Sequence, residues 1–112
     1  MIPFRRPEVR ERLFGGNGAV RVENLAGKLT APFTAALHCE LDPAGSVGPH
    51  QQEHDDEIVI GLEGEAVVYV NGTANPVVPG TLVALQLGAT LEIDNASVDA
   101  PFRYLIIKAR KG

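Results

Sequence analysis

The chain has 112 residues, of which 45% are hydrophobic and 21% are charged, as expected for one globular domain with a single modest core. The net charge of −4 gives no reason to expect a nucleic acid as partner, and no apolar run approaches membrane-spanning length. Cys39 is the only cysteine, which excludes an internal disulfide and a cysteine-based metal cluster. Since the N-terminus has no apolar signal-peptide core, we expect a cytoplasmic protein.

The first 17 residues are expected to form an N-terminal arm, and residues 18–109 a single barrel domain. Within the arm, Pro7 to Phe14 predicts a short helix, because proline suits the first helical turn and two glycines follow. Basic residues gather near both chain ends. We interpret them as solvated charge: Arg5, Arg6, Arg10, Arg12, Lys108, Arg110 and Lys111.

From Gly18 onward, apolar and polar residues alternate, which is typical of β-strands. Turn signals such as Asn71-Gly72 and Pro79-Gly80 recur every several residues and leave no space for crossover helices. The pattern predicts an all-β fold closed as a barrel or sandwich. The expected strands include residues 19–25, 32–41, 57–62, 65–70, 81–85, 90–95 and 101–109.

The strand at residues 32–41 shows which side chains share a face. Leu37, Cys39 and Leu41 fall on one face, and His38 falls on the other. We therefore expect Cys39 to be a small core residue and His38 to be exposed or at an interface.

The stretch from Gly45 to Gly64 contains two of the three histidines, His50 and His54, within or beside the densest acidic run. Imidazole nitrogens and carboxylate oxygens this close together can bind a divalent metal or a polar ligand. The acidic run alone, Glu53 to Asp56, lacks the glycine and spacing of a calcium-binding loop, so we interpret it as a solvated loop.

This stretch resembles the first motif of the cupin superfamily, which has a glycine, a His-x-His pair, a glutamate and, after six residues, a glycine. His50, Glu57 and Gly64 match that motif, while Pro79-Gly80 and Asn95 match the two ends of the second cupin motif. The two motifs, with the residues between them, span about half of the chain. The resemblance implies a double-stranded β-helix, the jelly-roll barrel of the cupins, with any metal inside it.

Two positions depart from the family pattern of three histidines and a glutamate around the metal. Gln52 stands where the second histidine belongs, and Leu91 where the histidine of the second motif belongs. An amide oxygen is a weak ligand for a borderline metal, and leucine cannot ligate. His54 points inward if the strand of His50 continues, or lies in a polar turn. The candidate ligands for zinc, manganese, iron or nickel are therefore His50, Gln52, His54 and Glu57.

Three functions remain open. The resemblance implies a metal-dependent dioxygenase, isomerase or decarboxylase using His50 and Glu57; without a metal, His50 oriented by Glu57 is the candidate acid–base pair. A binding module would hold a small molecule in a pocket of His50, Gln52, Glu57, Tyr69, Leu91 and Tyr104. A structural or regulatory homodimer would pair through residues 32–41 and the C-terminal strand. We expect a dimeric cupin-like barrel that binds a small molecule and has a weakened or lost metal site.

Overall fold

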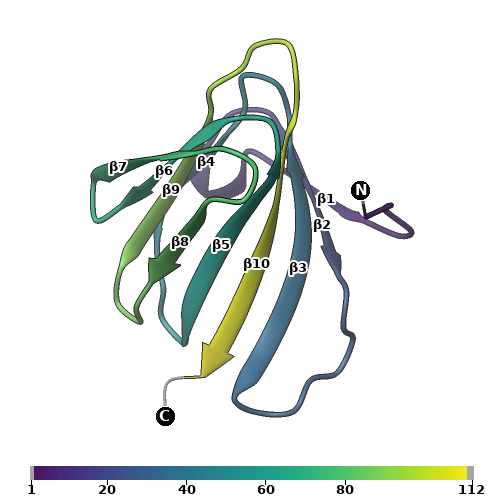
Figure 1. The fold of residues 1–112 in the computed structure, drawn as a ribbon, viewed down its shortest axis with the longest axis vertical. Helices are drawn as coiled ribbons and strands as arrows, with labels where there is room; N and C mark the ends of the chain where they lie inside the picture. Colours follow the sequence, from purple (N-terminus) through teal and green to yellow (C-terminus); the bar gives the residue numbers. More distant parts are fainter. Residues whose placement is uncertain (1, 111–112) are drawn as a thin grey trace.

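The computed structural model describes residues 2–110, and within them almost every regular element is a β-strand (Figure 1). One short 3-10 turn, η1 (Leu13–Gly15), is the exception, so no helix of the described part is long and apolar enough to cross a membrane. The strands in chain order are β1 (Glu8–Glu11), β2 (Ala19–Asn24), β3 (Phe33–Leu41), β4 (Ser46–Gln51), β5 (Asp55–Glu63), β6 (Ala66–Val70), β7 (Thr73–Val77), β8 (Leu82–Leu85), β9 (Thr90–Asn95) and β10 (Phe102–Arg110).

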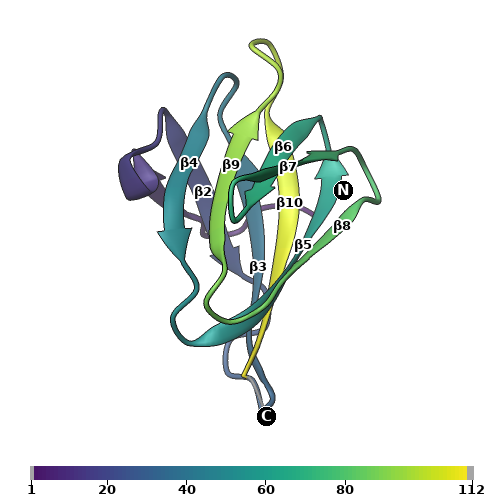
Figure 2. The ribbon, with the colours of Figure 1, turned by 90° about the vertical axis from the view of Figure 1, so that its left-hand side faces the viewer.

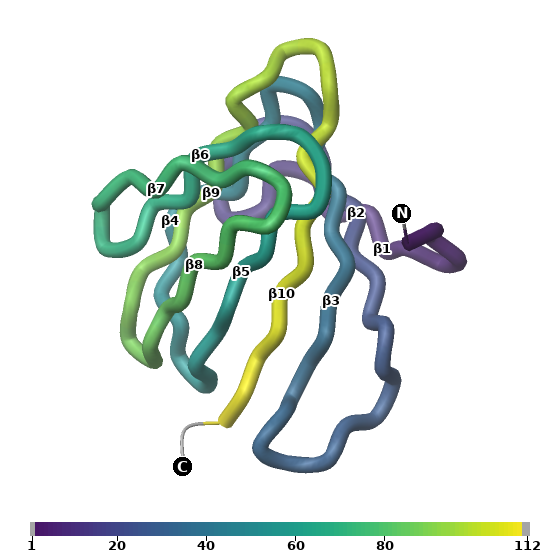
Figure 3. The backbone as a smooth tube through the Cα atoms, viewed as in Figure 1, coloured from purple at the N-terminus to yellow at the C-terminus, as the bar shows by residue number. Residues whose placement is uncertain are grey.

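These strands form two antiparallel sheets that lie against each other. The larger has the order β1-β2-β3-β10-β5-β8, and the smaller has the order β4-β9-β6-β7. Figure 2 shows the smaller sheet in front of the larger one. From β3 to β10 the chain changes sheet at every connection except the β6–β7 hairpin, as the tube in Figure 3 shows. The predicted all-β jelly-roll fold is confirmed.

The predicted helix over Pro7 to Phe14 is wrong. Glu8–Glu11 is strand β1, which pairs antiparallel with β2, and only a single 3-10 turn follows it. A helix of eight residues with one narrow apolar stripe gains too little from its own hydrogen bonds and packing to persist. Pairing with β2 satisfies the same backbone groups through a sheet that already exists.

The core lies between the sheets because inward and outward side chains alternate along each strand. Val59 of β5, Val68 of β6 and Phe102 of β10 are completely buried there. Cys39 is also buried, and desolvation raises the pKa of its thiol to about 12, so it remains a neutral core residue as expected. The apolar faces of the two sheets therefore form one shared core.

His38 lies on the outer face of β3, as predicted, but it is completely buried rather than exposed. The ring of Phe4 stacks on the imidazole, with centroids 4.2 Å apart and planes within 6°. The arm is held there because the backbone N–H groups of Arg5 and Arg6 donate to the Glu23 carboxylate at 2.9 and 2.7 Å. The prediction of an exposed His38 is wrong because residues before β1 fold back over the sheet.

Protonation of His38 is expected to destabilise the fold. Neither ring nitrogen has a hydrogen-bond partner among the described residues, and burial, followed by the charge of Arg103, lowers the pKa of the imidazole below 6.5. Glu23 and Glu40 oppose this shift without reversing it. The unfolded chain therefore binds the proton more readily, so this part of the stability is complete above pH 6.5 and is lost as the pH falls below it.

Thermal unfolding between pH 8 and pH 5 checks this expectation. We expect the midpoint of the wild-type chain to fall more steeply with acid than that of His38→Phe. His54→Gln removes an exposed histidine and should keep the wild-type slope. Equal slopes for the wild type and His38→Phe would contradict the expectation.

Candidate functional site

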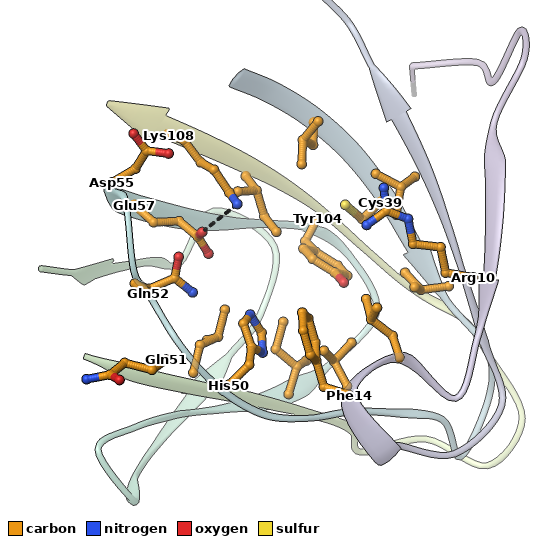
Figure 4. Close-up of a pocket in the computed structure, with 18 of the residues that line it drawn as sticks. Arg10, Phe14, Cys39, His50, Gln51, Gln52, Asp55, Glu57, Tyr104 and Lys108 are labelled. Atoms are coloured by element: carbon orange, nitrogen blue, oxygen red, sulfur yellow. Dashed lines mark ion pairs between the residues drawn. The ribbon is translucent and has the colours of Figure 1, made fainter. Parts of the chain in front are cut away.

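A cavity of about 520 Å³ lies between the two sheets (Figure 4). Its walls are mainly apolar and include Val47, Leu91 and Ile106. Polar side chains reach it from both sheets and from the loop after β4: His50, Gln52, Glu57 and Lys108. Apolar walls with a few convergent polar groups are typical of a small-molecule binding site.

Glu57 and Lys108 form a cross-strand pair on the cavity side of the larger sheet. Glu57 of β5 lies directly opposite Lys108 of β10, and Lys108 Nζ is 3.8 Å from Glu57 Oε1. Sequence reasoning missed Lys108 by treating it as terminal solvated charge. The signal that could have found it is the alternation of β10, because Tyr104, Ile106 and Lys108 all line the cavity.

The Glu57 carboxyl group is almost completely buried, with 3% of the residue exposed. Its Oε2 atom has no hydrogen-bond partner among the described residues. Burial raises the pKa of this carboxyl to about 7, although the neighbouring Lys108 ammonium acts to lower it. Glu57 can therefore exchange a proton near neutral pH, which an exposed glutamate does not do.

Gln52 follows β4, and its backbone fixes the loop there. Its N–H donates to Ala89 O at 2.9 Å, and its carbonyl accepts from Gly88 N–H at 2.8 Å. The side chain is 5% exposed, and its Nε2 amide has no partner among residues 2–110. Figure 4 shows this amide pointing into the cavity near the Glu57 carboxylate. The Gln52 amide is therefore a buried N–H donor that can bind an acceptor in the cavity.

The His50 ring lies against the ring of Phe14 at the cavity wall. The two ring centroids are 3.9 Å apart with planes within 13°, and His50 Nδ1 is 3.1 Å from Gly48 O. Because a carbonyl oxygen only accepts, this contact favours the tautomer with the proton on Nδ1. Burial lowers the pKa of the ring despite that bond. No hydrogen bond joins His50 to Glu57 in the described part of the chain, so the expected acid–base pair is not assembled by direct contact.

Phe14 is placed by backbone geometry that the sequence pattern did not reveal. It has a left-handed backbone (φ 53°), and the turn that carries it packs directly against β4. A Cβ atom on Gly48 would collide with the carbonyl of Phe14, so glycine is required for this close approach. The turn therefore fixes an aromatic ring over His50.

The remaining candidates divide between the cavity and the surface. Leu91 is 1% exposed, lines the cavity and lies opposite His50 in the ladder between β4 and β9; Tyr104 also lines it. His54 is exposed in the bend before β5, although it is among the residues that line the cavity. Tyr69 was expected to line the pocket, but it is absent from the lining because Val68, its neighbour in β6, points inward.

The residues of the cavity do not fit a divalent metal ion. No group of three or more histidine, cysteine, aspartate or glutamate side chains in residues 2–110 is arranged to hold one. Apart from the exposed or partly exposed side chains of residues 51 and 53–55, the donors are the His50 imidazole, the Gln52 amide and the Glu57 carboxylate, and the Lys108 ammonium lies beside that carboxylate. A second cation there would be repelled by the ammonium, and Leu91 supplies no donor.

Comparison with known proteins gives consistent results. The family model described as "Cupin domain" matches residues 37–108. A protein of Thermotoga maritima named oxalate-binding protein is 33% identical over 104 residues, covering 90% of this chain and 86% of that protein. A crystal structure of a predicted oxalate decarboxylase from the same organism superimposes with a TM-score of 0.83 and 26% identity, covering 94% of this chain and 92% of that one.

A third similarity concerns the fold alone. A Cupin 2 conserved barrel domain protein from Salinispora arenicola superimposes with a TM-score of 0.72 and 23% identity. The match covers 97% of this chain and 89% of that protein. The similarity thus extends over the strands of both sheets that build the cavity.

Proposed function

This chain belongs to the cupin superfamily, and we propose that it uses the barrel cavity to bind a small organic acid. The observation that carries the proposal is the pair of unpartnered polar atoms, Gln52 Nε2 and Glu57 Oε2, buried among apolar walls. Buried polar atoms without a partner are rare in folded proteins because each costs desolvation free energy. A ligand with hydrogen-bonding groups would satisfy both atoms.

Oxalate is the first ligand to test. The Thermotoga maritima relative that carries oxalate in its name is 33% identical to this chain. The cavity of about 520 Å³ falls in the range of small-molecule sites and is larger than oxalate itself needs. Longer mono- and dicarboxylic acids with an apolar part therefore belong in the same set of ligands.

Binding is favoured over metal-dependent catalysis for this chain. A Lewis-acid mechanism needs a firmly held ion, and the donor set around Glu57 does not fit one. Leu91 instead adds an apolar surface from β9, on the side of the cavity opposite β5, the strand that carries Glu57. Such a surface suits the carbon skeleton of an organic ligand.

Calorimetric titration with oxalate and a panel of short-chain carboxylic acids tests this proposal. We expect at least one acid to bind with a Kd between about 1 μM and 1 mM. Ile106→Trp fills the cavity and should weaken that binding at least about 10-fold, because the ligand and the indole compete for the same space.

The matched control is Leu105→Trp, which places the same side chain one residue earlier on the opposite face of β10. It should leave the affinity unchanged, provided that both variants keep the wild-type circular dichroism spectrum. Failure of every acid to bind the wild-type chain would contradict the proposal, as would equal affinities for the two variants.

A further inference from the structure

The strongest unassigned feature of the cavity is the ammonium group of Lys108. Its side chain is 33% exposed and extends along the inner face of β10 towards the buried carboxylate of Glu57 (Figure 4). The 3.8 Å separation from Glu57 Oε1 is longer than the 2.7–2.9 Å of a charge-assisted hydrogen bond. An ammonium has three donors, so Lys108 retains donors for a ligand.

Two kinds of donor meet in this part of the cavity. Lys108 contributes a charged N–H group from the larger sheet, and Gln52 contributes an unpartnered amide from the loop after β4. A carboxylate has two oxygens and can accept from both donors at once. A neutral ligand would leave the charge of the ammonium unused, and a cationic ligand would be repelled by it.

The other charges at the cavity do not remove this preference. Arg10 also lines the cavity, but its guanidinium pairs with Glu8 at 3.0 Å. Glu53 and Asp55 also line the cavity, but Glu53 is exposed and Asp55 is partly exposed. Water and salt screen such exposed charges much more than groups inside a cavity. Glu57 lies beside Lys108, and burial raises the pKa of its carboxyl group to about 7, so near neutral pH a large fraction of this group is neutral and does not cancel the ammonium charge. The ammonium of Lys108 therefore favours an anionic ligand at this end of the cavity.

We propose that Lys108 is the anion-binding residue of the cavity and that, with Gln52, it selects ligands by one carboxylate group. In this arrangement the ammonium of Lys108, on β10, occupies the position beside Glu57 that a divalent ion would otherwise need. The inference rests on the proposed function, because it specifies how the same cavity recognises an organic acid.

Calorimetric titration with the tightest-binding acid of the panel, in the presence of a chelator, tests the inference. Lys108→Met removes the charge and keeps most of the side-chain length, and it is expected to weaken binding about 10- to 100-fold. Gln52→Leu should weaken it about 10-fold through loss of one hydrogen bond. Arg110→Met removes an exposed positive charge two residues away and should change the affinity less than about 2-fold.

A second comparison uses only the wild-type chain and so does not depend on the folding of a variant. The amide in which the carboxylate of the same acid becomes neutral should bind at least about 10-fold more weakly. Equal affinity for acid and amide, or an unchanged affinity in a folded Lys108→Met variant, would overturn the inference and leave the proposed function intact. Binding that disappears with the chelator and returns with a divalent ion would overturn it as well. Failure of every acid to bind would instead overturn both.

Discussion

The triple variant Gln52→His, Leu91→His and Lys108→Met is expected to bind Zn²⁺ at least about 1,000-fold more tightly than the wild-type chain. With His50 and Glu57, it would present three imidazoles and one carboxylate to the same cavity. Positions 52 and 91 are both buried there, and Leu91 lies opposite His50 in the ladder. Four such donors suit the tetrahedral preference of zinc.

Competition titration against a chromophoric chelator measures this gain. The double variant that keeps Lys108 should bind Zn²⁺ at least about 10-fold more weakly than the triple variant, because the ammonium remains beside Glu57. A control with Tyr69→His and Glu92→His places two histidines opposite each other on the outer face of the smaller sheet. If the triple variant binds no better than this control, the cavity does not bring positions 52 and 91 together with His50 and Glu57.

Asn95→Leu is expected to lower the free energy of unfolding by about 3–5 kcal/mol. The Asn95 amide donates to the carbonyls of Asp42 at 3.0 Å and Ala100 at 2.9 Å, with a longer 3.5 Å contact to Leu41 O. Its Oδ1 accepts from Ser97 N–H at 2.9 Å. Leucine has a similar volume but would leave these buried and partly buried groups without partners.

Chemical denaturation compares this loss of unfolding free energy with the loss caused by replacing Asn24, an asparagine whose hydrogen bonds are local. Asn24 is exposed, and its hydrogen bonds lie within its own turn: its Nδ2 donates to Gly27 O at 3.2 Å, and its Oδ1 accepts from Ala26 N–H at 3.1 Å. Asn24→Leu should therefore cost less than about 1 kcal/mol. Similar losses for the two variants would show that the Asn95 hydrogen bonds do not hold the loops at this end of the barrel.

The sequence predicted the fold and part of the cavity because strand alternation is a local signal. Alternation in the last strand placed Tyr104 with Ile106, and the cupin resemblance placed Leu91 at a ligand position; both Tyr104 and Leu91 line the cavity. The same signal failed in β6, where Ala66 to Val70 is apolar apart from Tyr69, so the inward direction of that strand was ambiguous. Period two identifies a face only where polar and apolar residues alternate.

Contacts between distant parts of the chain were beyond the reach of local patterns. Phe4 covers His38, and the turn carrying Phe14 covers His50, yet neither aromatic residue lies in a periodic segment that indicates its partner. Lys108 had the required alternation, but its place near the chain end favoured the interpretation as solvated charge. Only the register of β10 against β5 brings it beside Glu57.

The most direct test of the account is the metal content and the acid affinity of one sample, purified without added metal or a metal-chelating tag. If Lys108 supplies the cation of the cavity, the protein should contain less than about 0.1 divalent ion per chain and bind its carboxylate ligand equally well with and without a chelator. An ion content near one per chain, with loss of acid binding when that ion is removed, would contradict the account.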